Sequence, residues 1–186
     1  VDQLEARCLG PEPALLAPEL AAMGCTLLST ARAPKPEAEG HYRDLDALLA
    51  ESDVVSIHCP MTNETTGLFD DTAIAALKPG ALLVNTARGG ITDLDAIERG
   101  LRSGRIGAAG LDVLPQEPPD LAHPLLKAWR AKEAWLEGRL VVTPHAAFFT
   151  PESLADMRRL AALTVHQFLT EGTLRAPVTV DTTRPR

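Results

Sequence analysis

Residues 81–113 decide the fold, and they read ALLVNTARGGITDLDAIERGLRSGRIGAAGLDV. The segment opens with an apolar run at 81–85, continues with a polar-faced stretch at 93–102, and closes with a second, small-residue-rich apolar run at 107–113. In the middle stretch the apolar residues recur with the spacing of one helix face, at Leu94, Ile97 and Leu101. Two short strands joined by a helix predict a parallel βαβ unit.

The same alternation extends on both sides of this unit. Upstream, the sequence predicts a helix at 44–51, a strand at 53–58 and a second helix at 70–77. Downstream, it predicts a last strand at 140–143 and a long helix at 151–171. Because the predicted strands are almost entirely apolar, we expect them to be covered on both faces. This pattern favours an α/β fold with a doubly wound, Rossmann-type parallel sheet.

The composition is that of an ordinary soluble globular protein. Of the 186 residues, 45% are hydrophobic and 23% are charged, a balance that is neither fibrous nor disordered. The net charge of -7 and the absence of a basic run argue against a direct nucleic acid partner. No stretch approaches the roughly 18–20 apolar residues of a membrane helix, and no secretory signal is visible. We therefore expect no membrane partner and a cytoplasmic location.

Two further sets of residues are expected to serve packing. The three cysteines have neither CxxC nor metal-ligand spacing, so we expect reduced, buried thiols at Cys8, Cys25 and Cys59. Trp129 and Trp135 lie in an expected helix at 124–137, inserted between two polar loops. The alternative is that this insertion shapes the mouth of a pocket or a dimer contact.

Three of the predicted strands run directly into unusual polar loops. Arg88 follows the strand at 81–85 and is flanked by small residues, which we expect to let a ligand approach the backbone. Glu117 follows the strand at 107–113, and His145 follows the last strand within Thr-Pro-His. Ligands of doubly wound sheets bind at the carboxyl ends of the strands. We therefore expect these side chains to converge on one cleft, with Glu117 within hydrogen-bond reach of His145.

These three side chains suit the chemistry of a 2-oxo acid. A guanidinium pairs with a carboxylate through two parallel hydrogen bonds, so Arg88 is a candidate to bind the substrate carboxylate and polarise the carbonyl. His145 is a candidate general acid, and a carboxylate beside it, such as Glu117, orients the ring and raises its pKa. Each residue alone is more often a solvated or structural one. Their occurrence together at one sheet edge favours a catalytic interpretation.

Four segments resemble the signature segments of the D-isomer-specific 2-hydroxyacid dehydrogenases, in order and in spacing. They are Asn-Thr-Ala-Arg-Gly-Gly at 85–90, the stretch from Gly-Leu-Asp-Val to Glu-Pro at 110–118, Thr-Pro-His at 143–145, and the cofactor-side loop at 58–65. The resemblance covers about residues 41–171. It implies an oxidoreductase that transfers a hydride between NAD or NADP and a 2-oxo or 2-hydroxy acid. The stretch from His145 to Phe149 is more similar to the branch that includes the C-terminal-binding-protein corepressors than to the formate dehydrogenases.

The resemblance assigns the catalytic roles argued above to Arg88, Glu117 and His145, and it gives Asp112 the role of holding the nicotinamide carboxamide. Together with the strand-end rule, it implies a set of cofactor-binding residues. They are Gly10, Thr30, Arg32, Cys59, Pro60, Thr65, Thr86, Ala87, Asp112 and His145.

The first 40 residues are a degenerate version of the family's opening. The family begins its cofactor domain with a strand, a GxGxxG turn and a helix whose N-terminus receives the pyrophosphate. That turn falls here on residues 8–13, where Gly10 alone is retained, Glu12 adds negative charge and Pro13 removes an N–H group. Pro18 falls within the following helix. We therefore expect weak phosphate binding.

The choice between NAD and NADP stays open. The strand at 25–30 is not followed by the acidic residue that grips the ribose hydroxyls of NAD. Arg32, with Thr30 and Lys35 nearby, suits the 2′-phosphate of NADP. The alternative is that Arg32 is a solvated loop charge.

The sequence predicts one dinucleotide-binding domain at 1–172 and a tail at 173–186. In the family, the substrate domain is built mostly from residues that precede the cofactor domain. Little precedes residue 8 here, so we expect the substrate domain to be largely absent. Two functions stay open: a dehydrogenase domain, or a catalytically silent nucleotide-binding or dimerisation module. The resemblance also implies a homodimer formed through the cofactor domains.

Overall fold

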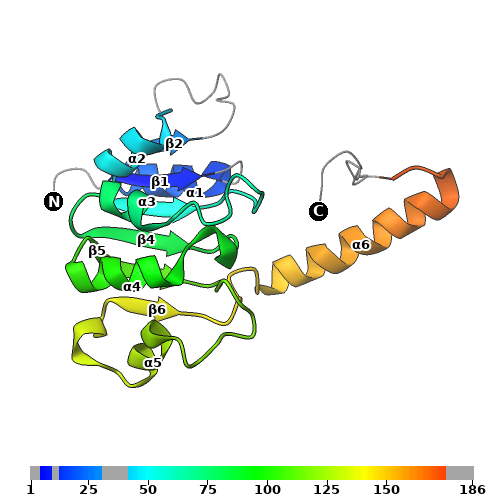
Figure 1. Ribbon diagram of the computed structural model, residues 1–186. Coiled ribbons are helices and arrows are strands. Elements are labelled where there is room, and N and C mark those ends of the chain that lie inside the picture. The colour runs from blue at the N-terminus through cyan, green and yellow to red at the C-terminus, as the bar shows by residue number, and fades with distance from the viewer. Residues whose placement is uncertain (1–4, 10–12, 31–41, 175–186) are drawn as a thin grey trace. The chain divides into compact units, whose positions relative to one another are not determined.

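The computed structural model describes residues 5–9, 13–30 and 42–174, and Figure 1 shows the order of the elements along the chain. The chain divides into two compact units, residues 1–147 and residues 148–186, each described by itself. The first unit holds a β-sheet. In the described part of the second unit, the one regular element is the helix α6 (Pro151–Glu171). The division thus falls before α6, whereas the domain predicted from the sequence includes that helix.

A parallel sheet forms the first unit, and its described strands follow the order β2-β1-β3-β4-β5-β6. The strands are β1 (Glu5–Leu9), β2 (Thr26–Thr30), β3 (Val54–Ile57), β4 (Ala81–Asn85), β5 (Ile106–Leu111) and β6 (Leu140–Val142). The predicted α/β fold class with a Rossmann-type sheet is confirmed. β1 lies inside the sheet, between β2 and β3, although Glu5 and Arg7 make its sequence unusual for such a position.

Three helices on one side of the sheet begin where the sequence supplies a cap. Asp44, Asp70 and Asp93 each accept a hydrogen bond from a backbone N–H of the first helical turn. These bonds satisfy donors that a helix leaves without an internal partner. The capped helices are α2 (Leu45–Glu51), α3 (Asp71–Ala76) and α4 (Leu94–Ser103). The remaining helix before the insertion is α1 (Pro13–Ala22), which contains Pro18 as predicted.

The helix predicted at 124–137 is interrupted. α5 (Pro124–Arg130) ends early, and a separate 3-10 turn, η3 (Ala134–Leu136), follows it. Lys132, between them, has a φ of 53°, in the left-handed region that no residue of a right-handed helix adopts. The prediction of one continuous helix was wrong because the residue at the break is a lysine, and neither glycine nor asparagine marks the stop.

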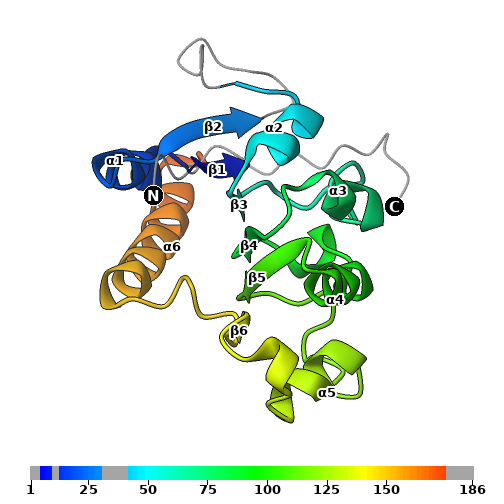
Figure 2. The same cartoon turned by 90° about the vertical axis from the view of Figure 1, so that its left-hand side faces the viewer.

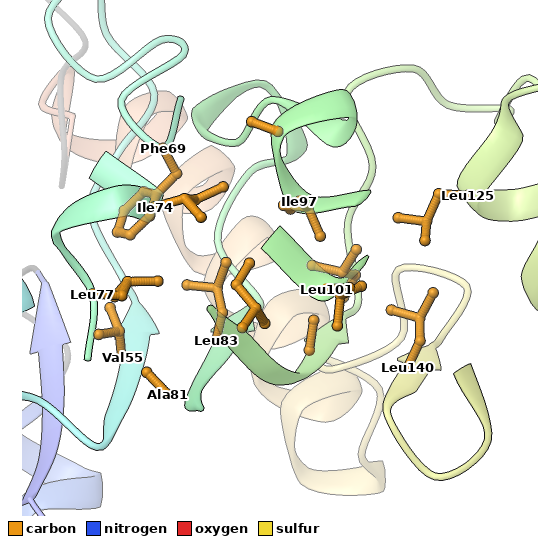
Figure 3. Close-up of a cluster of buried hydrophobic side chains, with 14 of the residues drawn as sticks. Val55, Phe69, Ile74, Leu77, Ala81, Leu83, Ile97, Leu101, Leu125 and Leu140 are labelled. Carbon is orange, nitrogen blue, oxygen red and sulfur yellow. The ribbon is translucent and has the colours of Figure 1, made fainter. Parts of the chain in front are cut away.

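The hydrophobic core lies on one face of the sheet. Figure 2 shows α2, α3 and α4 on that side and α1 on the other. Figure 3 shows core side chains from strands and helices, among them Val55, Leu83, Ile97 and Leu101. On the opposite face, Leu82 and Val141 are 40% and 61% exposed. Within the first unit, the core face is therefore covered more completely than the opposite face.

Arg139 joins three elements just before β6. Its guanidinium donates hydrogen bonds of 2.7 to 3.0 Å to the backbone carbonyls of Leu101, Ile106, Gly107 and Trp135. These carbonyls belong to the last turn of α4, the start of β5, and η3. Backbone carbonyls that are shielded from water need a hydrogen-bond donor. The Arg139 side chain supplies donors to four carbonyls at this junction.

Arg139→Met keeps the apolar stem and removes the donors. We expect it to lower the free energy of unfolding by about 2–4 kcal/mol, because several carbonyls lose a charged hydrogen-bond partner. Urea denaturation followed by circular dichroism measures this loss. Arg159→Met is the control: it removes the exposed pair with Asp156 at 3.0 Å, and the expected change is below about 0.5 kcal/mol. Equal losses in the two variants would contradict the prediction.

Candidate active site

The carboxyl ends of the strands lie level across the sheet. The last residues of neighbouring strands pair with one another. Across the sheet, from β2 to β6, these residues are Thr30, Leu9, Ile57, Asn85, Leu111 and Val142. The loops that follow these strands therefore start at a single edge. This edge carries the loops that contain Arg88, Glu117 and His145, as the strand-end rule predicts.

Glu117 and His145 form a direct pair. The carboxylate Oε2 of Glu117 lies 2.7 Å from Nδ1 of His145, and both side chains are well exposed. This confirms the predicted geometry of the two residues. Since an ionised carboxylate only accepts hydrogen bonds, Nδ1 of His145 carries a proton in this pair. The hydrogen bond from His145, helped by the N–H of Leu114, holds the pKa of Glu117 below its ordinary value.

The backbone of His145 is held in an unusual conformation. Its φ is 51°, in the left-handed region. Its N–H donates to the carbonyl of Asp112 at 2.8 Å and to that of Thr143 at 3.0 Å. These bonds support a conformation that residues other than glycine rarely adopt.

The Asp112 carboxylate, 6% exposed, organises the loop around His145. It accepts hydrogen bonds from the hydroxyl of Thr143 at 2.5 Å and from the N–H groups of Ala146 and Ala147 at 2.9 Å each. Burial alone would raise the pKa of Asp112, but these hydrogen bonds outweigh it and hold the pKa below its ordinary value. Its resemblance-based role toward the nicotinamide stays a prediction, and the loop contacts are a function that the sequence did not reveal.

Asp112→Asn tests this organising role. The ionised carboxylate stabilises the fold above its unfolded-state pKa of about 4, and the contribution is lost as pH falls through the lower folded-state pKa. We expect the variant to lose about 1–3 kcal/mol of unfolding free energy at neutral pH and to show a shallower decline in acid. Urea denaturation over a pH series measures both effects. Asp46→Asn, on the exposed first turn of α2, is the control, and neutral-pH stability equal to that of the parent would contradict the prediction.

Arg88 is exposed at the same edge, between β4 and the 3-10 turn η2 (Gly89–Ile91). Its Nη1 donates to the carbonyl of Ala87 at 2.6 Å. A cavity of about 410 Å³ is lined by Glu117 and His145, but Arg88 is not among its lining residues. Glu117 and His145 therefore converge as predicted. Arg88 lies at the same sheet edge but does not line their cavity.

The two tryptophans differ in their surroundings. Trp129 lines the cavity beside Glu117 and His145, in line with the alternative that the insertion shapes a pocket. Trp135 packs against the core, stacks under the guanidinium of Arg102 at 4.0 Å, and donates to Glu133 at 2.7 Å. The expected packing role is therefore confirmed for Trp135, and Trp129 also packs against the core besides lining the cavity.

Gly89 and Gly90 have a different use from the one expected. A Cβ on Gly89 would lie 2.0 Å from the backbone carbon and oxygen of Leu114, and one on Gly90 would lie 2.8 Å from the sulfur of Met61. The space beside these glycines is thus filled by the protein itself. The expectation that small residues here admit a ligand was wrong for Gly89, because the absence of a side chain lets the Arg88 loop pack against the loop that carries Glu117.

The predicted cofactor residues are only partly within the described chain. Gly10, Arg32 and the side chain of Cys8 lie outside it, and Thr30 is half-buried at the end of β2. The Thr65 hydroxyl donates to the carbonyl of Pro60 at 2.7 Å and accepts from the N–H of Thr62 at 2.7 Å, so Thr65 folds the loop after β3. The free thiols Cys25 and Cys59 are half-buried, where full burial was expected, and burial raises the pKa of Cys59.

One cluster has side chains of the kind that bind metals. Ligand atoms of Asp95, Glu98 and His123 lie within 4.8 Å of one another. Nδ1 of His123 accepts from the N–H of Leu125 at 3.2 Å, so Nε2 carries the ring proton and donates to Asp95 at 3.0 Å. Capping of α5 by His123 and the 2.8 Å pair of Glu98 with Arg102 therefore account for the cluster.

A family model described as D-isomer specific 2-hydroxyacid dehydrogenase, NAD binding domain, matches residues 14–147. The match runs from α1 to the loop after β6 and includes both Glu117 and His145. The chain belongs to this family. The resemblance argued from the signature segments is thus confirmed, and the described sheet is the family's NAD-binding domain. The nearer likeness to the corepressor branch stays a prediction.

Individual relatives agree with this assignment. The glyoxylate reductase of Aeropyrum pernix is 40% identical over 145 residues, which cover 76% of this chain and 41% of that enzyme. The NAD-complexed D-isomer specific 2-hydroxyacid dehydrogenase from Lactobacillus delbrueckii ssp. bulgaricus has a TM-score of 0.80 at 30% identity, over 95% of this chain and 56% of that one. A glyoxylate reductase from Paecilomyes thermophila has a TM-score of 0.82 at 29% identity, over 94% and 52%. The chain thus spans about half the length of these relatives.

Proposed function

We propose that this chain serves the nicotinamide-dependent interconversion of a 2-oxo acid and a 2-hydroxy acid. The observation that carries the proposal is the 2.7 Å contact between Glu117 and His145 at the carboxyl edge of the family's NAD-binding domain. A paired histidine and carboxylate at this edge is what proton transfer to a carbonyl oxygen requires.

In reduction, Nε2 of His145 donates a proton to the carbonyl oxygen of the substrate. Glu117 holds the proton on Nδ1, fixes the ring and stabilises the charged imidazolium before the transfer. Arg88 binds the substrate carboxylate through its guanidinium. When bound, the cofactor supplies the hydride, and in the opposite direction it accepts one.

The described edge fits a dinucleotide. Thr86 is exposed and Ala87 half-buried after β4, and Cys59 is half-buried and Pro60 exposed after β3, so the side chains that border the edge are small or compact. Asn85 and Ile57 are opposite each other in register, which places these two loops next to each other. We infer that Cys59, Pro60, Thr65, Thr86 and Ala87 border the bound cofactor, with Asp112 and His145 at its nicotinamide end.

The choice between NAD and NADP rests on Thr30 and Arg32. Titration of the chain with NADH and with NADPH, followed by cofactor fluorescence, is expected to show weak binding, with NADPH bound no more weakly than NADH. The reasons are the charge and the missing N–H group at Glu12 and Pro13, and the cation at Arg32. Arg32→Glu should weaken NADPH selectively. Tight binding selective for NADH would contradict both parts of the prediction.

A second candidate is a nucleotide-binding or dimerisation module without catalysis. The altered turn at 8–13 favours it, as does the position of Arg88 outside the cavity beside Glu117 and His145. The same titration separates the two candidates in part, because a silent dimerisation module would bind neither cofactor. A module that binds a nucleotide without catalysis is distinguished by an assay of turnover.

The assembly and location follow from the same proposal. We infer a homodimer and a cytoplasmic location, with a small 2-oxo or 2-hydroxy acid as the partner and no direct contact with nucleic acid or membrane. No helix in the described part of the chain has the length and apolar character needed to cross a membrane. Light scattering of the purified chain measures its oligomeric state.

A further inference from the structure

Asn85, the last residue of β4, is a polar residue whose neighbours across the sheet are apolar. It is fully buried, and its neighbours in register on β3 and β5, Ile57 and Leu111, are buried apolar residues. A buried amide is costly unless its donors and acceptor are satisfied. The contacts of Asn85 therefore indicate what it is there to hold.

Those contacts are directed at the loop that carries Arg88. Nδ2 of Asn85 donates to the carbonyl of Arg88 at 3.0 Å, and Oδ1 accepts from the N–H of Ala87 at 3.0 Å. Because a carbonyl only accepts and an N–H only donates, these two partners fix the orientation of the amide. Asn85 thus holds the Thr86–Ala87 and Arg88–Gly89 peptide groups, and the short segment between them contains the α-carbons of Ala87 and Arg88.

The rest of the loop is equally constrained. Each backbone carbonyl from Ala87 to Ile91 accepts at least one hydrogen bond, and the donors are Arg88 Nη1, Asn85 Nδ2, Ile91 N, Thr92 N and Oγ1, Gly67 N and Phe69 N. The hydroxyl of Thr92, which is 3% exposed, also lies 3.5 Å from the Asn85 amide. A loop with these bonds presents its arginine from one backbone conformation.

Asn85 also connects this loop to the His145 loop. Its own carbonyl accepts from the N–H of Asp112 at 3.0 Å, and the carbonyl of Asp112 accepts from the N–H of His145 at 2.8 Å. A short chain of backbone bonds therefore runs from the arginine loop to the general acid.

We propose that Asn85 is a positioning residue for Arg88: it aims the guanidinium at the substrate carboxylate by fixing the peptide groups at the two ends of the Ala87–Arg88 segment. The inference rests on the proposed function, in which Arg88 binds that carboxylate. A role in folding alone would be served by an apolar side chain, as it is at Ile57 and Leu111 in the same row.

Two substitutions test the proposal. N85V removes both side-chain hydrogen bonds and introduces an apolar side chain, like those of the register neighbours Ile57 and Leu111. N85D keeps the acceptor for Ala87 and loses the donor to Arg88, until a lower pH protonates the introduced carboxyl group and restores a donor. Arg139→Met is the matched control, since it destabilises the same sheet without touching the loop.

The first measurement is the affinity for oxamate, a 2-oxo acid analogue, by NMR titration in the presence of NADH. We expect N85V and, at a pH of about 8, N85D to bind oxamate at least about tenfold more weakly than the parent, because a displaced arginine no longer reaches the carboxylate. Arg139→Met should stay within about twofold. On lowering the pH to about 6, N85D should recover toward the parent measured at the same pH. Parent-like affinity in both Asn85 variants would overturn the proposal.

The second measurement is the NMR signal of the Arg88 side-chain Nε–H, which needs no ligand. It should be single in the parent and in Arg139→Met, and broadened or doubled in N85V. An unchanged Arg88 signal in a folded N85V variant would also overturn the proposal. Failure of the parent chain to bind oxamate would count against the proposed function, while the Arg88 signal would still decide the role of Asn85.

Discussion

Gly89→Ala is expected to destabilise the protein by about 3 kcal/mol or more, because the added Cβ would lie 2.0 Å from the backbone carbon and oxygen of Leu114. Neither atom belongs to a flexible side chain, so one of the two loops must move. Leu114 donates its N–H to the Glu117 carboxylate at 3.1 Å, and its displacement is therefore expected to disturb the pair with His145 as well. Urea denaturation measures the loss of stability, and the His145 ring signals in NMR report on the pair.

Gly110→Ala provides the matched control. It also places a methyl group at the sheet, but the nearest atom to that Cβ is Val84 Cγ2 at 3.9 Å, an ordinary contact. We expect a change within about 1 kcal/mol. If Gly89→Ala were as mild as Gly110→Ala, the close approach of the Arg88 and Glu117 loops would not be a determinant of the fold.

Turnover of a 2-oxo acid is expected to be negligible for the 186-residue chain assayed by itself with pyruvate, glyoxylate or hydroxypyruvate. Orientation of reactants in a closed, water-free cleft lowers a barrier by about 7–11 kcal/mol. The matched region accounts for 41% of the Aeropyrum pernix glyoxylate reductase, and the family resemblance implies a substrate domain that supplies the opposing wall of the cleft. Absorbance of NADH and NADPH at saturating cofactor measures the rate.

A fusion to the remaining part of that reductase, with a GxGxxG turn restored, is expected to recover turnover. In this fusion, His145→Ala should lower kcat by about 10²–10⁴, as expected for loss of a general acid. Arg88→Ala should raise KM and lower kcat/KM, because it removes a carboxylate partner. Rapid turnover by the 186-residue chain, abolished by His145→Ala, would show that the chain is sufficient.

The sheet and the Glu117–His145 pair were accessible from the sequence because both depend on short-range patterns. Apolar runs bounded by helical periodicity locate the strands, and parallel strands bring their carboxyl ends to one edge regardless of the details of packing. The loops after β5 and β6 therefore start at the same edge, and Glu117 in the first and His145 in the second are a carboxylate and an imidazole able to form such a pair.

Other features depend on contacts between loops that no local pattern encodes. Gly89 has the same appearance in the sequence whether a ligand or Leu114 fills the space beside it. The break at Lys132 is not marked by a glycine, so the sequence gives no signal for it. The loop contacts of Asp112 involve residues more than 30 positions away. Asn85 offered one usable signal, since an asparagine that ends a buried strand must find partners for its amide.

The backbone of His145 has a consequence for how this position responds to selection. A residue other than glycine with a φ of 51° carries a conformational cost of about 1–3 kcal/mol, and asparagine or glycine would reduce it. Selection for folding alone would thus move position 145 away from histidine. Under the proposed function, an imidazole at this position lowers stability in exchange for chemistry, and libraries screened only for thermal stability would tend to discard it.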